Sequence, residues 1–207
     1  MVRIAITKGR IEEDVCKILE DAGFDTRKII SKDRELLVKM ADDIEVIFTK
    51  SNDILTFIEN GIVDLGIVGK DILDESEFRE YNELLDLNVG KCYFALAGFP
   101  EYKKKNKEQK KRIATRYPNI AKKYFLDRKE DVEIIKMEGS VELGPICGIS
   151  DAIVDLVQTG STLKANGLEV IEKMEDISTR LIANKESVKE KSKEIYRFVG
   201  RLEEARC

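Results

Sequence analysis

The chain has 207 residues, with 36 lysines and arginines against 40 aspartates and glutamates, a formal net charge of -4, and no histidine. The lack of histidine excludes an imidazole general base, a serine–histidine or cysteine–histidine nucleophile pair, and any metal site that needs imidazole. The small net charge implies no overall attraction to nucleic acid or to an anionic membrane. With 43% hydrophobic residues, the chain is expected to be a soluble globular protein with a substantial core.

The cysteines and the hydropathy pattern point to the cytoplasm. The four cysteines lie far apart and form no C-x-x-C pair, which fits reduced thiols rather than a zinc ribbon or a redox motif. No apolar stretch approaches the length of about 18 residues that a membrane-spanning helix needs. The N-terminal sequence MVRIAITKGR lacks the apolar core of a signal peptide.

Short apolar runs rich in β-branched residues alternate with amphipathic stretches, which is typical of an α/β fold with mostly parallel sheets. After the first run, apolar residues recur at helical spacing over residues 11–22, and a second amphipathic helix is predicted over 187–204. The polar, basic run at 101–112 favours a solvated helix or loop over an anion site. The expected strands are 2–7, 44–49, 64–68, 93–97, 112–115, 132–136 and 152–157.

Residues 152–163 carry the most chemical information. An apolar strand that holds one acid, Asp155, leads into a Thr-Gly-Ser-Thr loop at 159–162 and then into a helical start. Glycine lets the backbone approach a phosphate, and consecutive N–H groups and hydroxyls can donate to its oxygens. The aspartate can accept hydrogen bonds from vicinal sugar hydroxyls, so the layout suits a ribose 5-phosphate. A strand followed by a Ser/Thr helix cap would give the same pattern.

Two common nucleotide-binding loops are absent from the sequence. Gly69-Lys70 is followed by Asp71 and has no glycine at position 64, so it is not a Walker A loop. No G-x-G-x-x-G opens a helix. A P-loop kinase and a Rossmann dehydrogenase are therefore not expected.

The spacing over residues 142–163, E-x5-G-x-S-x2-I-x-D-L-x2-T-G-x-T-L, resembles the signature of the ATP phosphoribosyltransferases, which open histidine biosynthesis. The likeness extends over nearly the whole chain, through residues 6–10, 64–71, 114–119 and 163–168. The matching residues are Glu142, Gly148, Ser150, Ile153, Asp155, Leu156, Thr159, Gly160, Thr162 and Leu163.

The resemblance implies a two-lobed α/β fold like that of the type II periplasmic binding proteins, with the active site in the cleft between the lobes. Lobe I would hold residues 1–90 and 178–207. Lobe II would hold residues 91–177, with the phosphoribosyl-binding loop.

The implied reaction moves the 5-phosphoribosyl group of 5-phosphoribosyl 1-diphosphate to N1 of the adenine of ATP. Adenine N1 already carries a lone pair, so no general base is needed to create the nucleophile, and the missing histidine is no obstacle. Mg²⁺ bound to the diphosphate would neutralise charge, and no protein ligand to the metal is assigned.

The resemblance also implies roles for individual residues. Thr159, Gly160, Ser161 and Thr162 would hold the 5-phosphate, and Asp155 the ribose hydroxyls. Lys8 and Arg10 would face diphosphate or ATP phosphates, a surface turn being the alternative. Lys50 stands where relatives commonly carry arginine, which keeps the charge and loses a bidentate fork. Asn88 replaces a glycine that is common in the family. Further candidates for substrate contacts are Glu142, Lys50 and Asp151.

The end of the chain after the second amphipathic helix resembles the short form of the family. That form works with a separate regulatory subunit resembling histidyl-tRNA synthetase, which implies a dimer within a hetero-oligomer and no nucleic acid or membrane partner. Two other functions stay open on the residues alone. One is a non-catalytic ligand sensor or solute receptor. The other is a phosphoribosyltransferase for free bases, although those usually carry two adjacent acids, whereas Leu156 follows Asp155 here.

Overall fold

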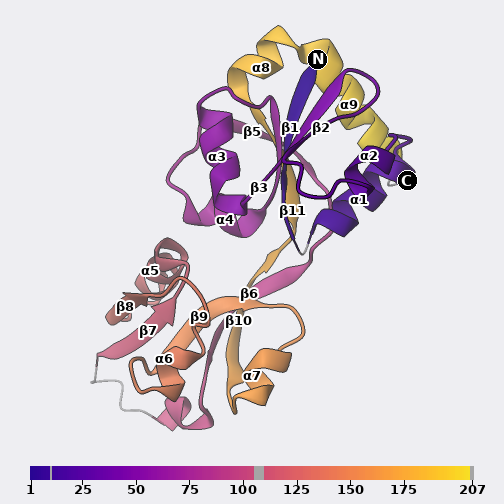
Figure 1. The fold of residues 1–207 in the computed structure, drawn as a ribbon. Coiled ribbons are helices and arrows are strands. Elements are labelled where there is room, and N and C mark those ends of the chain that lie inside the picture. The colour runs from indigo at the N-terminus through magenta and orange to yellow at the C-terminus, as the bar shows by residue number, and fades with distance from the viewer. Residues whose placement is uncertain (10, 105–109, 206–207) are drawn as a thin grey trace. The chain divides into compact units, whose positions relative to one another are not determined.

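The structure is a computed structural model that describes residues 1–9, 11–104 and 110–205. It divides into two compact units, and each has its own sheet (Figure 1). Unit 1 comprises Met1–Gly90 and Ser178–Cys207, and unit 2 comprises Lys91–Ile177. The expected two-lobed α/β fold is confirmed. The chain passes between the units twice, because unit 2 lies in the middle of the sequence of unit 1.

Unit 1 contains a mixed six-stranded sheet with the order β2-β3-β1-β4-β11-β5. β1 is parallel to β3 and to β4, so the carboxyl ends of these three strands meet at one edge of the sheet. β11 runs antiparallel between β4 and β5. The strands are β1 (Val2–Thr7), β2 (Leu37–Lys39), β3 (Ile44–Thr49), β4 (Leu65–Gly69), β5 (Tyr81–Asp86) and β11 (Thr179–Asn184).

Helices cover both faces of this sheet (Figure 1). One face packs against α1 (Glu12–Asp21), α2 (Arg27–Ile30) and α9 (Ser192–Glu204), and the other against α3 (Ser51–Glu59) and α4 (Lys70–Glu75). The helix expected over 187–204 is two helices, α8 (Lys185–Glu190) and α9, with a break at Lys191. Its predicted apolar face is confirmed in α9. There Ile195, Phe198, Val199 and Leu202 are buried.

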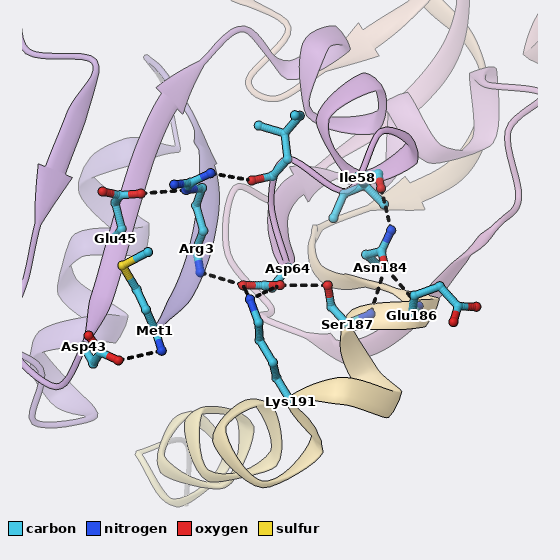
Figure 2. Close-up of polar contacts among 11 residues, drawn as sticks. Met1, Arg3, Asp43, Glu45, Ile58, Asp64, Asn184, Glu186, Ser187 and Lys191 are labelled. Carbon is cyan, nitrogen blue, oxygen red and sulfur yellow. Dashed lines mark hydrogen bonds and ion pairs between the residues drawn. The ribbon is translucent and has the colours of Figure 1, made fainter.

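A buried carboxylate fixes the start of β4 to β1, to α8 and to Lys191 between α8 and α9 (Figure 2). Asp64 accepts hydrogen bonds from the Arg3 N–H at 2.9 Å, the Ser187 hydroxyl at 2.7 Å and the Lys191 ammonium at 2.8 and 2.9 Å. Burial alone would raise the pKa of Asp64. The hydrogen bonds from Lys191, Arg3 and Ser187 outweigh that effect and lower it.

Unit 2 contains a five-stranded sheet with the order β10-β6-β9-β7-β8. β7 is parallel to β8 and to β9. β6 is antiparallel to β9, and β10 is antiparallel to β6. One face packs against α5 (Pro118–Asp127) and the 3-10 helix η1 (Pro100–Lys104), and the other against α6 (Leu143–Ile146) and α7 (Ser161–Ala165). The strands are β6 (Cys92–Gly98), β7 (Lys111–Thr115), β8 (Val132–Lys136), β9 (Ala152–Val157) and β10 (Glu169–Ile177).

The expectation of mostly parallel sheets is wrong for the described residues, because four strand pairings are parallel and five are antiparallel. Four of the antiparallel pairings involve β2, β5, β10 or β11, which were not predicted as strands, and the fifth joins β6 to β9. The basic run at 101–112 holds part of η1 and the start of β7, and residues 105–109 within it lie outside the described residues. In the described part of the chain, no helix combines the length and the apolar character needed to cross a bilayer.

The two chain crossings are bonded to each other on the unit 1 side. Leu87 N–H donates to Thr179 O at 2.9 Å, and Thr179 N–H donates to Val89 O at 3.0 Å. Asp86 accepts from the Ser178 hydroxyl at 2.9 Å and from Asn88 N–H at 2.8 Å, and it pairs with Arg180. These contacts lower the pKa of Asp86, although burial acts in the opposite direction.

Asn88 and Gly90 give the first crossing its sharp turn. Asn88 has φ +59°, a left-handed conformation that asparagine tolerates well, which explains how it can replace glycine here. Gly90 has φ +62°, and a Cβ there would lie 2.6 Å from Ile11 Cγ2 and 2.9 Å from Thr179 Oγ1. Asparagine therefore preserves the turn, whereas position 90 has no room for a side chain.

Replacing Gly90 with alanine should lower the free energy of unfolding by about 2–4 kcal/mol, because overpacking adds to left-handed strain. Gly61→Ala is the matched control, since Gly61 has φ +64° and nothing within 4 Å of the added Cβ. That control should lose only about 1 kcal/mol. Urea unfolding of both variants checks the difference, and equal losses would contradict the packing argument.

Candidate active site

The carboxyl ends of β7, β8 and β9 meet at one edge of the unit 2 sheet, since these strands are parallel. Three segments leave the sheet there: Arg116 follows β7, residues 137–142 follow β8, and residues 158–162 follow β9. The carboxyl ends of parallel strands are where open α/β sheets bind ligands. This edge therefore carries most of the residues predicted from the sequence to contact substrate.

The Thr-Gly-Ser-Thr loop joins the buried end of β9 to α7. Gly160 adopts φ +73°, so the loop turns through a left-handed residue. The hydroxyls of Thr159 and Ser161 lie 3.0 Å apart, and Ser161 N–H points to Thr159 Oγ1 at 3.4 Å. Thr159, Ser161 and Thr162 are exposed. The loop thus presents several hydroxyl donors and backbone N–H groups within a few residues, which suits the oxygens of a phosphate.

Asp155 lies inside β9, two residues before the strand ends, and is half-buried. It shares a face of the sheet with Ile153 and Val157, which pack in the cluster that also contains Leu163 of α7. Its partner across the sheet is Ala95 of β6, which has a small side chain. Asp155 is therefore on the face covered by α6 and α7, about 7 Å along the strand from its carboxyl end.

Glu142 reaches the same edge from a different strand. It is half-buried and immediately precedes α6, and its neighbour Val141 packs in one cluster with Val157 and Leu163. The structure therefore brings Glu142, Asp155 and the loop at 159–162 to one edge and one face of unit 2.

Asp151 does not join this group. It precedes the amino end of β9, about 20 Å along the strand from the loop. Its Oδ2 accepts the Arg112 N–H at 2.8 Å, its Oδ1 lies 3.5 Å from Arg112 Nη2, and its side chain is only 9% exposed. The carboxylate ties the start of β9 to the start of β7, which is a structural role.

Unit 1 has a corresponding edge at the carboxyl ends of β1, β3 and β4. Lys8 follows β1 and Lys50 follows β3, and both are exposed. Thr7 is paired with Thr49, and Lys8 N–H donates to Thr49 O at 2.9 Å, so the two lysines leave neighbouring strands side by side. Among the residues that the structure describes, neither lysine has an ion-pair partner. Arg10, the other predicted cation, lies outside the described residues.

Two basic residues at these edges were not among the predicted site residues. Lys70 is the first residue after β4, and Arg116 is the first residue after β7. Both follow a buried apolar run directly, and that position was the available signal. Within the described ranges, no group of three Cys, Asp or Glu side chains could hold a metal ion. The carboxylates at the unit 2 edge that were predicted to contact substrate are those of Asp155 and Glu142.

Comparison with solved structures defines the fold class. The periplasmic VFT2 domain of BvgS from Bordetella pertussis aligns over 97% of this chain and 86% of its own, with a TM-score of 0.59 and 13% identity. At that identity the likeness concerns the fold alone, and it supports the expected type II periplasmic-binding-protein-like architecture. The protein is thus of the two-lobed α/β class. The parallel strands of one unit lead into a loop that suits a phosphate, and those of the other are followed by lysines.

Residues 50–204 match the family model described as HisG: ATP phosphoribosyltransferase. The ATP phosphoribosyltransferase of Lactococcus lactis is 57% identical over 99% of both chains. The ATP phosphoribosyl transferase (HisG:HisZ) complex from Thermotoga maritima aligns with a TM-score of 0.83 and 33% identity, over 99% of this chain and 98% of that one. The chain belongs to the ATP phosphoribosyltransferase family and is a transferase.

Proposed function

We propose that this protein transfers the 5-phosphoribosyl group from 5-phosphoribosyl 1-diphosphate to N1 of the adenine of ATP. The products are N1-(5-phosphoribosyl)-ATP and diphosphate, and the reaction is the first step of L-histidine biosynthesis. The bond from N1 to the ribose C1 forms as the bond from C1 to diphosphate breaks, and the adenine then loses a proton. Family membership supports the reaction class.

The observation that carries the proposal is the grouping of Asp155, Glu142 and the loop at 159–162 on one face and edge of unit 2. The loop would bind the 5-phosphate through its N–H groups and hydroxyls. Asp155 would accept hydrogen bonds from the two ribose hydroxyls and hold C1 in a fixed orientation. Glu142, on the same edge, would contact the donor from the side of α6.

Charge is the main obstacle to this reaction, because two polyanionic substrates must approach while a positive charge develops at C1. The exposed ammonium groups of Lys8 and Lys50 would bind phosphate oxygens. Mg²⁺ carried by the diphosphate would supply further neutralisation. The carboxylate oxygens of Asp155 and Glu142 are the ligand type that Mg²⁺ prefers, so the unit 2 edge is chemically compatible with a metal-bound donor.

A HisZ-like regulatory chain resembling histidyl-tRNA synthetase is the proposed partner, with this chain present as a dimer within a cytoplasmic hetero-oligomer. The Thermotoga maritima relative was solved as a HisG:HisZ complex, and that title supports the proposal. Feedback by histidine would then act through the partner.

Incubation of the purified protein with ATP, 5-phosphoribosyl 1-diphosphate and Mg²⁺ tests the function, with the partner added in a parallel reaction. The expected result is an absorbance change from N1-substituted adenine and release of diphosphate in equal amounts. Replacing ATP with free adenine should abolish both signals. Product formed from the free base would refute the proposal. So would the absence of product from ATP both with and without the partner.

A further inference from the structure

Three lysines follow three neighbouring strands of unit 1. The strands β3, β1 and β4 are adjacent and parallel, and Lys50, Lys8 and Lys70 are the first residues after their carboxyl ends. The registers place Lys50 level with Lys8 and Lys70 one residue further along, because Ile6 of β1 is paired with Phe48 of β3 and with Ile67 of β4. Neighbouring strands are about 4.8 Å apart, so the three lysines are spread over about 10 Å of the sheet edge.

Lys70 differs from the other two because it has a counterion. Its ammonium lies 2.5 Å from Asp74 Oδ1, one turn further along α4, and the two side chains are only 24% and 27% exposed. The other carboxylate oxygen, Asp74 Oδ2, is buried and has no hydrogen-bond partner among the described residues. Because one buried carboxylate oxygen stays unsatisfied, this ion pair is less favourable than one in which both oxygens accept hydrogen bonds.

The backbone of Lys70 is fixed while its side chain is held only by that pair. Lys70 N–H donates to Ser178 O at 3.0 Å, which ties the start of α4 to the residue before β11. The four-carbon stem of lysine is flexible, so the ammonium can change partners without moving the helix. A polyphosphate at this edge would present several charged oxygens to the Lys70 ammonium, whereas the ion pair with Asp74 uses one carboxylate oxygen, Oδ1.

We infer that Lys70 is a third cation for a linear polyphosphate at this edge, and that it exchanges Asp74 for phosphate oxygens when the ligand binds. The inference rests on the proposed function, which brings a triphosphate and a diphosphate to the protein. It extends that function by adding a residue that binds the polyphosphate. It also makes Asp74 a competitor of the ligand for the Lys70 ammonium. Removing Lys70 and removing the charge of Asp74 must therefore have opposite effects on binding.

The test measures calorimetric binding of inorganic tripolyphosphate to the full chain and to two variants. Lys70→Met should weaken binding by about 5- to 10-fold, because one charge-assisted contact is lost. Asp74→Asn should tighten tripolyphosphate binding by about 2- to 5-fold, because the ion pair that competes with the ligand for the Lys70 ammonium is removed. Because added salt screens charges, it should reduce the difference in tripolyphosphate binding between each variant and the wild type. Lys70→Gln keeps most of the stem and replaces the methionine variant if that variant does not fold.

Lys189→Met is the matched control. Lys189 also forms a helical ion pair, with Glu186 at 2.8 Å, but on α8, which follows the end of β11 at the opposite edge of the sheet. It should change tripolyphosphate binding by less than twofold. Effects of Lys70 and Asp74 variants in the same direction, or no larger than the control, would overturn the inference, as would a wild-type protein that does not bind tripolyphosphate.

Steady-state kinetics then identify the natural source of the polyphosphate. A raised KM for ATP in Lys70→Met, with kcat within about twofold, assigns the triphosphate. A raised KM for 5-phosphoribosyl 1-diphosphate instead assigns the diphosphate. Tripolyphosphate binding requires no turnover, so a protein that binds it as expected but forms no product would refute the proposed function and not the role of Lys70.

Discussion

Replacement of Asp155 with asparagine should lower kcat/KM for 5-phosphoribosyl 1-diphosphate by roughly 100-fold or more. The change keeps the shape of the side chain and removes the charge that accepts hydrogen bonds from the ribose hydroxyls. Each charge-assisted hydrogen bond is worth about 1.5–3 kcal/mol, and about 2.7 kcal/mol corresponds to a factor of 100 in rate. Initial rates with the partner subunit present, at saturating ATP, measure the effect.

Asp151→Asn is the matched control for this prediction, because it makes the same chemical change on the residue before the same strand. Asp151 bonds Arg112 at the end of β9 away from the loop, so its variant should keep activity within about threefold and lose about 1–2 kcal/mol of stability. Wild-type turnover by Asp155→Asn with both substrates saturating would show that Asp155 does not position the ribose.

Asp64→Asn should lower the free energy of unfolding by about 2–3 kcal/mol. An amide cannot accept hydrogen bonds from Arg3 N–H, Ser187 and Lys191 together, and its own NH₂ group would face donors at a site where the native side chain is only 6% exposed (Figure 2). Lys191 is 39% exposed and can turn toward solvent, which keeps the loss below that of a fully buried pair.

Urea unfolding measures this loss, and Glu80→Gln serves as its control. Glu80 pairs with Lys185 at 2.8 Å, but its side chain is 76% exposed, so the control should change stability by less than about 0.5 kcal/mol. A loss for Asp64→Asn that does not exceed that of Glu80→Gln would contradict the anchoring role of the network.

The free energies of unfolding of the wild type and of Asp64→Asn should also differ in their dependence on pH. Because the pKa of Asp64 is lowered in the folded state, its contribution is fully present above the unfolded-state pKa of about 3.9. It is lost as the pH falls through the lower folded-state pKa. The stability difference between wild type and Asp64→Asn should thus be constant near neutral pH and shrink below about pH 4. A difference that grew on acidification would have the wrong sign.

The strands that could be predicted from the sequence are those in which apolar, mostly β-branched residues predominate. The predicted bounds of β1, β3, β8 and β9 match the structure. β10 was missed because five of its nine residues are exposed, so its polar pattern resembles a loop. β11 was missed for a different reason, since its continuous apolar run is only Leu181, Ile182 and Ala183, which is too short to stand out.

The site was predictable where its residues share one motif. Asp155 and the loop at 159–162 belong to one strand–loop–helix unit, so sequence distance and spatial distance agree. Asp151 precedes Asp155 by only four residues, yet an extended strand separates them by about 13 Å, so nearness in the sequence does not bring Asp151 to the loop. Lys70 could not be singled out, because a lysine in a structural i,i+4 ion pair and a lysine that exchanges its partner for a ligand look the same in a sequence.

The position of β11 has a consequence for the order in which the newly made chain can be completed. Unit 2 is one continuous stretch, whereas the sheet of unit 1 needs β11, which is made after unit 2 and lies between β4 and β5. During synthesis β4 therefore presents an unpaired edge for as long as residues 91–177 are being added. The half of the protein that is translated first is thus the half that must wait to finish folding.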